Sequence, residues 1–208
     1  MADQSIRDFA QALGTKTPTP GGGAAAGHTA LFGASLGQML IEFARGRKEN
    51  ANRVEEFESA ADRLRTVVEH LTPMAERDAA AFSHVAGAYG LPKGTNDEKN
   101  TRIRAIQESL LGALAVPEEM VHLCRDALVA LSSISDGVGR NLVGDAGTSA
   151  ALLQSAARAG ELLVRSNASY LHDRDKARAT LLRVDAVMRE IQKLRREIDL
   201  RVEDLIDG

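Results

Sequence analysis

Apolar residues recur every three or four positions along most of this chain, which is the spacing of one face of an α-helix. The segment from Val54 to Leu71 shows this spacing clearly, and a second stripe runs from Val184 to Leu205. No segment alternates apolar and polar residues as a half-buried strand would. The pattern predicts helices over residues 5–14, 23–44, 54–71, 73–90, 95–135 and 147–171, and from 173 onward.

Local signals at the helix ends support this division. Thr72 precedes Pro73, an order typical of a helix start with threonine as the cap. Thr95 and Glu98 form a capping box that opens a long fifth helix. Pro117 lies inside that helix and is expected to kink or split it, because proline lacks the backbone N–H.

The segment from Gly23 to Ala44 carries small residues on nearly every face, so we expect neighbours all round it and place it at the centre of the fold. Polar residues such as His28 and Glu42 interrupt it, which argues against a membrane span. Short links between helices are typical of antiparallel bundles. The predicted fold is therefore an all-α, up-and-down bundle of about seven helices with a buried central helix, in a single domain over residues 1–208.

Composition narrows the function classes. The 208 residues are 44% hydrophobic and 26% charged, with a net charge of −3, so we expect neither a nucleic-acid nor a membrane partner. The single cysteine, Cys124, excludes an intramolecular disulfide and a cysteine-rich zinc site. The N-terminal residues lack the basic and then apolar order of a signal peptide, which predicts a cytoplasmic location.

Three segments break the helical pattern with residues that suit ligand binding. Residues 17–23 read TPTPGGG, and their glycines allow backbone N–H groups to approach an anion at a helix start, or they simply form a tight packing turn. Residues 137–147 are rich in glycine and include Asn141 and Asp145, although Asp145 is also a plausible helix cap. Arg47 and Lys48 form a basic pair that is either an anion contact or a solvated helix end.

Some kinds of chemistry find no support in the sequence. It contains no H-E-x-x-H motif and no carboxylate cluster with metal spacing, so we expect no metal. No serine has the context of a nucleophile elbow, which disfavours covalent acyl chemistry.

At these same places the chain resembles a known family, the cyclodeaminase domain of formiminotransferase-cyclodeaminase and its single-domain relative, methenyltetrahydrofolate cyclohydrolase of the serine-cycle type. The resemblance covers nearly the whole chain, and PTPGGG with a downstream DAG is its most specific part. The matching pieces are TPTPGGGAAA at 17–26, GRK at 46–48, DAAAF at 78–82, GAYGLPK at 87–93, AIQE at 105–108, NLVGDAG at 141–147, and Asn167.

The resemblance implies an all-helical homodimer that hydrolyses 5,10-methenyltetrahydrofolate to 10-formyltetrahydrofolate, with this tetrahydrofolate derivative as its substrate and no metal or redox cofactor. It implies catalytic roles for Asp145, Lys48 and Asp78, without deciding which aspartate acts at the reacting carbon and which binds the pterin. Lys48 is either a catalytic amine or a contact for the folate carboxylate. The substrate-binding residues carried over by the resemblance are Thr19, Gly21, Gly22, Gly23, Arg47, Asn141 and Asn167.

Two alternatives stay open. A formiminotetrahydrofolate cyclodeaminase on the same scaffold would release ammonia. The second alternative is a helical dimer that binds folate without catalysis. It is suggested by Gly139, Gly144 and Leu163, because the family pattern has the polar residues asparagine, serine and asparagine at these positions. The apolar stripe ending at Leu205 needs a surface to cover it, and the resemblance favours the partner subunit over the chain's own bundle.

Overall fold

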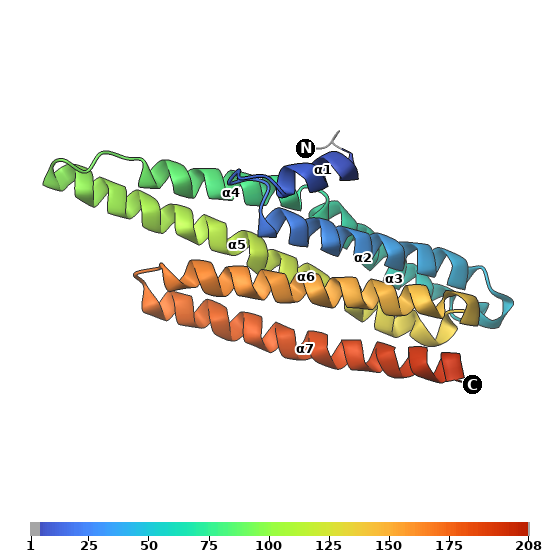
Figure 1. Ribbon diagram of the computed structural model, residues 1–208. Helices are drawn as coiled ribbons and strands as arrows, with labels where there is room; N and C mark the ends of the chain where they lie inside the picture. The colour runs from blue at the N-terminus through green and yellow to red at the C-terminus, as the bar shows by residue number, and fades with distance from the viewer. Residues whose placement is uncertain (1–4, 208) are drawn as a thin grey trace.

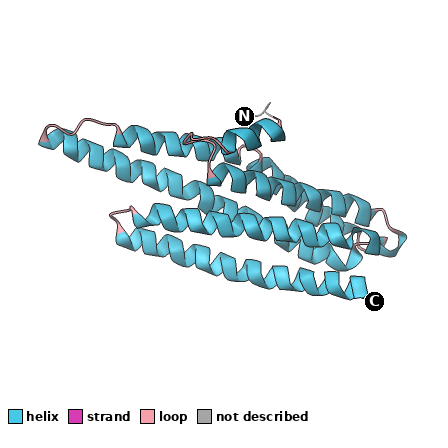
Figure 2. Ribbon diagram, in the orientation of Figure 1, coloured by secondary structure: helices cyan, strands magenta, loops and turns pink. Residues whose placement is uncertain are grey.

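The computed structural model describes residues 5–207, and helices joined by short loops make up this part of the chain, which contains no strand (Figure 2). The expected all-α class is confirmed. The elements are α1 (Ile6–Leu13), α2 (Gly22–Arg45), the 3₁₀ turn η1 (Lys48–Asn50), α3 (Val54–Leu71), α4 (Met74–Tyr89), α5 (Asn96–Ile134), the 3₁₀ turns η2 (Ser135–Gly137) and η3 (Arg140–Leu142), α6 (Val143–Ser169) and α7 (Arg174–Asp207).

One predicted helix cap is wrong and another is confirmed. Thr72 does not cap α4: Pro73 is the N-cap residue, no side chain caps this helix, and the Thr72 hydroxyl instead donates to the Val68 carbonyl oxygen within the preceding helix. The Thr95 side chain accepts a hydrogen bond from the Glu98 N–H, and the Glu98 side chain accepts one from the Thr95 N–H, so the capping box is confirmed. Of the two outcomes expected at Pro117, a kink or a split, the split is wrong, because α5 runs unbroken through 39 residues with Pro117 buried inside it. A side chain from another helix takes over the bond that proline removes, as described below.

The central position of α2 is confirmed, since α6, α3, α4 and α5 all pack against it (Figure 1). Glycines allow the closest approach: a Cβ atom on Gly33 would lie 2.9 Å from Cγ of Leu153 on α6. Burial all round is nevertheless wrong, because one face of α2 stays open. Phe32 is 46% exposed and Phe43 is 60% exposed on that face.

The apolar stripe of α7 packs on the chain's own α5 and α6. Val184, Ile191 and Ile198 are almost fully buried within one protomer. The expectation that a partner subunit covers this stripe is therefore wrong.

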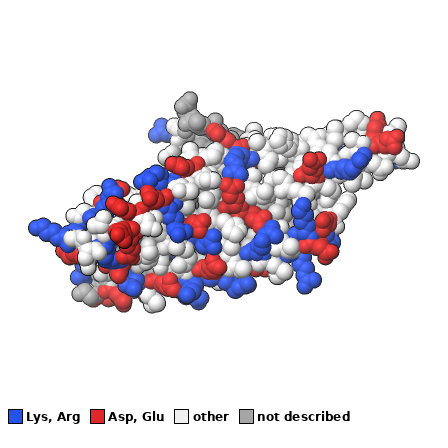
Figure 3. Space-filling view, turned by 180° about the vertical axis from the view of Figure 1, so that it is seen from behind, with Lys and Arg blue, Asp and Glu red and all other residues white. Residues whose placement is uncertain are grey.

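The bundle is elongated, and the hairpin formed by α4 and the first part of α5 projects beyond the other helices (Figure 1). Seen from behind, basic and acidic side chains are interspersed over the surface (Figure 3). No helix in residues 5–207 is long and apolar enough to span a membrane.

Candidate functional site

A cleft of about 500 Å³ lies where the N-terminal end of α2 meets α4, α5 and the end of α6. The cleft is lined by residues from three distant parts of the sequence that the resemblance had assigned to one site. Those residues are Thr19, Gly21, Gly22, Gly23, Asp78 and Asn167. The structure thus brings together six of the ten predicted site residues, and we call this the first half-site.

Asp78 lies directly against the start of α2. The Ala24 backbone N–H donates a hydrogen bond to its carboxylate, as an anion at a helix N-terminus allows. A Cβ atom on Gly23 would lie 1.9 Å from Oδ1 and 2.2 Å from Cγ of Asp78, so only glycine leaves room for the carboxylate. Burial raises the pKa of Asp78, because desolvation outweighs that hydrogen bond. A carboxyl group with a raised pKa is suited to exchange protons with a substrate.

Asn167 is held in the cleft by a consequence of Pro117. Proline has no N–H to give to the carbonyl four residues earlier, which here belongs to Ala113. The Asn167 Nδ2 donates to that carbonyl oxygen at 2.9 Å. The amide is therefore oriented, with one of its two N–H groups bonded to Ala113 and its oxygen left as an acceptor.

Sequence reasoning gave no role to several residues that shape this cleft. Phe82 and Tyr89 from α4 and Tyr170 after α6 supply aromatic walls, and Leu163 lies where the family pattern has an amide. Phe82 and Tyr89 fall inside the matched pieces DAAAF and GAYGLPK, which was the available signal. Tyr170 carried no signal at all.

The other predicted residues lie at the opposite end of α2. Arg47 and Lys48 follow that helix directly, and Asp145 lies in the first turn of α6. Arg47 and Asn141 approach each other over Gly139, where a Cβ atom would lie 1.9 Å from Arg47 Nη1 and 2.7 Å from Asn141 Oδ1. Lys48 is exposed and Asp145 is half-buried. We call Arg47, Lys48, Asn141 and Asp145 the second half-site.

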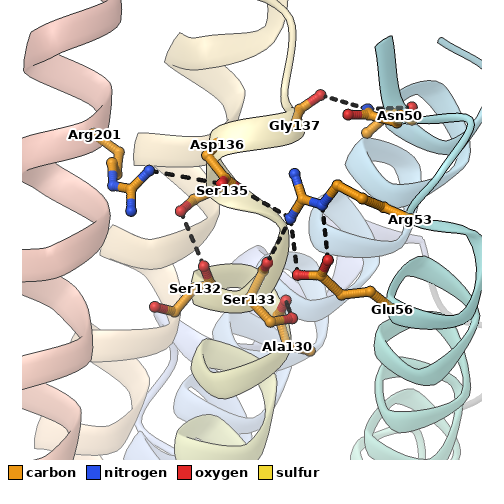
Figure 4. Close-up of polar contacts among 11 residues, drawn as sticks. Asn50, Arg53, Glu56, Ala130, Ser132, Ser133, Ser135, Asp136, Gly137 and Arg201 are labelled. Atoms are coloured by element: carbon orange, nitrogen blue, oxygen red, sulfur yellow. Dashed lines mark hydrogen bonds and ion pairs between the residues drawn. The ribbon is translucent and has the colours of Figure 1, made fainter. Parts of the chain in front are cut away.

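A polar network holds this end of the molecule together (Figure 4). The buried Asn50 donates through Nδ2 to the carbonyl oxygens of Ala44, at 2.7 Å, and Gly137, at 2.9 Å. Arg53 pairs with Glu56 at 2.7 Å and with Asp136 at 2.9 Å. These bonds tie the turn after α2 to the turn before α6, and so fix the backbone that carries the second half-site.

Within one chain the two half-sites do not meet. They lie at the two ends of α2, whose 24 residues span about 36 Å at 1.5 Å per residue. Helix α6 runs the other way, with Asp145 in its first turn and Asn167 in its last. One protomer therefore cannot place Asp78 and Asp145 around the same small molecule.

Two other side chains that could be reactive, Cys124 and His28, are instead packed against neighbouring residues of the fold. Cys124 is buried, and desolvation raises the pKa of its thiol to about 12. His28 packs edge-on against Phe9, with ring centroids 4.5 Å apart. Across residues 5–207 no group of three histidine, cysteine or acidic side chains is placed to bind a metal ion.

Comparison with known proteins finds relatives that share most of this chain. The chain is 31% identical over 196 residues to a methenyltetrahydrofolate cyclohydrolase of Methylorubrum extorquens, covering 94% of both proteins. It is 26% identical to the formimidoyltransferase-cyclodeaminase of Rattus norvegicus and spans 35% of that longer protein. The crystal structure of a formiminotetrahydrofolate cyclodeaminase from Thermotoga maritima has the same fold, with a TM-score of 0.87, 22% identity and 98% coverage of each chain.

The sequence model of the formiminotransferase-cyclodeaminase family matches residues 5–186, which includes both half-sites. The chain belongs to the formiminotransferase-cyclodeaminase family.

Proposed function

We propose that this protein hydrolyses 5,10-methenyltetrahydrofolate to 10-formyltetrahydrofolate. The observation that carries the proposal is the Asp78 carboxylate, seated on Gly23 with a raised pKa in a cleft that also holds Asn167. The Methylorubrum relative, similar over almost its full length, bears the name of this activity.

The reaction needs proton transfers and charge complementarity. Water attacks the carbon that bridges N5 and N10, a C–O bond forms, and the water proton goes to a general base. The hydroxyl proton of the resulting intermediate is then lost as a C=O bond forms and the bond from that carbon to N5 breaks; N5 receives a proton, so that one proton is released overall. No oxidation state changes, so the reaction calls for no redox cofactor. The substrate carries a delocalised positive charge, which a nearby carboxylate attracts.

We assign the proton transfers to Asp78, Asp145 and Lys48. Asp78 is the better candidate for exchanging a proton, since its pKa is raised by burial. Asn167 offers its amide oxygen to N–H groups of the pterin edge, because the bond from its nitrogen to Ala113 fixes the orientation of the amide. The aromatic walls supplied by Phe82, Tyr89 and Tyr170 suit a flat ring system.

We further propose that the protein works as a homodimer whose active sites are shared. The half-sites lie at opposite ends of the antiparallel pair α2 and α6. A two-fold axis perpendicular to this pair stacks it on its copy in the reverse direction. The first half-site of each protomer then faces the second half-site of its partner, and two complete sites form.

The open face of α2 and α6 supports this assembly. Helices α2 and α6 lie side by side (Figure 1). Uncharged residues that are exposed or partly exposed recur at helical spacing along both of them. They are Phe32, Leu36, Met39 and Phe43 on α2, and Thr148, Leu152, Ser155, Ala159 and Leu162 on α6. The face seen in Figure 3 carries many charges instead. An apolar face of this length is typical of a subunit interface.

Loss of the ultraviolet absorbance of methenyltetrahydrofolate tests the activity. The purified protein should accelerate it far above the spontaneous rate, and an equal rate with and without protein would refute the proposal. Mixing Asp78→Asn with Asp145→Asn tests the shared site. Random exchange of subunits should restore about a quarter of the wild-type activity, because half of the dimers are mixed and each has one intact site. No recovery after demonstrated exchange would refute the sharing.

Light scattering tests the interface. Phe43→Glu places a charge in the open stripe of α2 and should convert a dimer into monomers of 22.2 kDa. Leu200→Glu is the matched control, since Leu200 is 61% exposed on α7, away from that stripe. A wild-type protein that is monomeric at micromolar concentrations would refute the dimer.

Cyclodeaminase activity is the second candidate, because the rat and Thermotoga proteins carry that name. It would expel ammonia from formiminotetrahydrofolate while the methenyl ring closes. An ammonia-release assay separates the two activities. A protein that binds folate and catalyses neither reaction would instead fit the inactive dimer.

A further inference from the structure

Arg47 occupies a space that only glycine at position 139 can leave open. Its backbone is extended, with φ −81° and ψ 140°, and directs the side chain back over the start of η3. A Cβ atom on Gly139 would lie 1.9 Å from Nη1 and 3.2 Å from Cζ of Arg47. Any side chain at position 139, including the asparagine of the family pattern, would therefore displace the guanidinium.

The guanidinium is poorly satisfied in this position. Its Nε is buried and makes no hydrogen bond. Among the described residues its ion-pair partner is Glu49, at 3.6 Å from Nε to Oε2, whereas charge-assisted bonds are usually about 2.7–2.9 Å. The neighbouring Arg45 and Arg53, by contrast, each have a carboxylate oxygen at 2.7 Å. Arg47 thus keeps donors available for an anion.

We propose that Arg47, seated on Gly139, is a binding site for a carboxylate of the substrate's glutamate, and that Gly139 is the residue that determines this specificity. This inference rests on the proposed function. A guanidinium presents paired N–H donors that match a carboxylate, and it would repel the cationic methenyl ring. The glutamate end of the folate therefore lies at the second half-site.

This placement also sets the direction of the substrate. The pterin end lies at the first half-site, with Asp78 and Asn167. The bridging carbon lies between the pterin and the glutamate, where residues of both half-sites can reach it. Where the family pattern has a neutral asparagine amide, this chain has Gly139, and the positively charged guanidinium of Arg47 fills the space that glycine leaves.

The test compares methenyltetrahydrofolate with an analogue in which both glutamate carboxylates are primary amides. The wild type should have a KM for the diamide about ten- to a hundredfold higher, the value of hydrogen bonds to a charged group. Gly139→Ala should lower the ratio of the two KM values, diamide over methenyltetrahydrofolate, by a similar factor, because its methyl group displaces the Arg47 guanidinium; since the methyl group would also lie 2.7 Å from Asn141 Oδ1, the effect is read from this ratio and not from either KM alone. Arg47→Gln should give the same result without altering the backbone at position 139.

Gly144→Ala is the matched control, because a Cβ atom there meets nothing within 4 Å. Equal KM values of the wild type for both compounds would overturn the inference while leaving the proposed function intact. So would a Gly139→Ala variant that keeps the wild-type preference for the carboxylates. If the wild type does not hydrolyse either compound, the proposed function fails. Calorimetric binding of 5-formyltetrahydrofolate and its diamide then decides the carboxylate site, and equal affinities would overturn it.

Discussion

Replacing Gly23 by alanine tests whether the seat of Asp78 matters for catalysis. The new methyl carbon would lie 1.9 Å from Oδ1, 2.2 Å from Cγ and 2.5 Å from Oδ2 of Asp78. Carbon atoms in contact prefer about 3.5–4.0 Å, so the carboxylate must move by more than about 1 Å. It then loses the hydrogen bond from the Ala24 N–H.

The effects on stability partly cancel, whereas those on catalysis do not. Alanine stabilises a helix by at most about 0.5–1 kcal/mol relative to glycine, and a lost bond to a charged group removes about 1.5–3 kcal/mol. We therefore expect the free energy of unfolding of Gly23→Ala to fall by no more than about 2.5 kcal/mol. A misplacement of about 1 Å can reduce a rate about 10²-fold, which is the loss of kcat that we expect.

Absorbance at saturating methenyltetrahydrofolate gives kcat, and thermal unfolding followed by circular dichroism shows that the variant is folded. Gly87→Ala is the matched control on the helix that carries Asp78, because a Cβ atom there meets nothing within 4 Å. It should retain wild-type activity. A folded Gly23→Ala variant with wild-type kcat would refute the role given to the Asp78 carboxylate.

Four further outcomes are expected. Asp145→Asn should lower turnover at least about 10²-fold with the fold intact, and a near-normal rate would remove Asp145 from catalysis. Lys48→Met separates the two roles of that lysine. If the amine is catalytic, turnover should be abolished while folate still binds; if it binds the glutamate tail of the folate, KM should rise, and more so with a larger number of glutamates. No change in turnover or KM would exclude both roles. Folding disfavours the ionised form of Asp78, so the free energy of unfolding should fall as pH rises from the ordinary carboxyl pKa through the raised pKa of Asp78. Chemical denaturation at a series of pH values should show this decrease in the wild type, and the decrease should disappear in Asp78→Asn. Truncation after Val184 should unfold the chain, since each buried side chain lost from α7 removes about 1.5–3 kcal/mol from a typical total of about 5–15, and a truncated protein with a normal circular dichroism spectrum would contradict this.

Most of the fold could be predicted because local signals and packing agree. The capping box at Thr95 and the stripe of α3 depend on neighbours in the sequence, and both are confirmed. The unbroken course of α5 at Pro117 was not predictable, because it depends on Asn167, a side chain fifty residues further along the chain. The open face of α2 could have been found, since Phe32 and Phe43 share one face among much smaller residues.

The sequence identified candidate residues of the site, but it did not show how these residues are arranged in space. Thr19, Asp78 and Asn167 line one cleft as expected. The motif around Asp145 gives no sign in the sequence that it lies apart from this cleft. In the fold it lies in the first turn of α6, beside the far end of the 24-residue helix α2. Tyr170 could not be recognised, since an isolated tyrosine after a helix has no distinguishing pattern.

The proline inside α5 has a consequence for protein engineering. A programme to improve heat resistance would choose Pro117→Ala early, since alanine is the better helix former by about 3 kcal/mol. The restored N–H would compete for the Ala113 carbonyl and release the Asn167 amide to rotate. The stabilised variant would then bind its ligand less tightly, which is a stability–activity trade-off at a residue that belongs to no motif. Because the carbonyl left open by Pro117 is the one that orients Asn167, the two residues should be exchanged or retained together in any redesign of this scaffold.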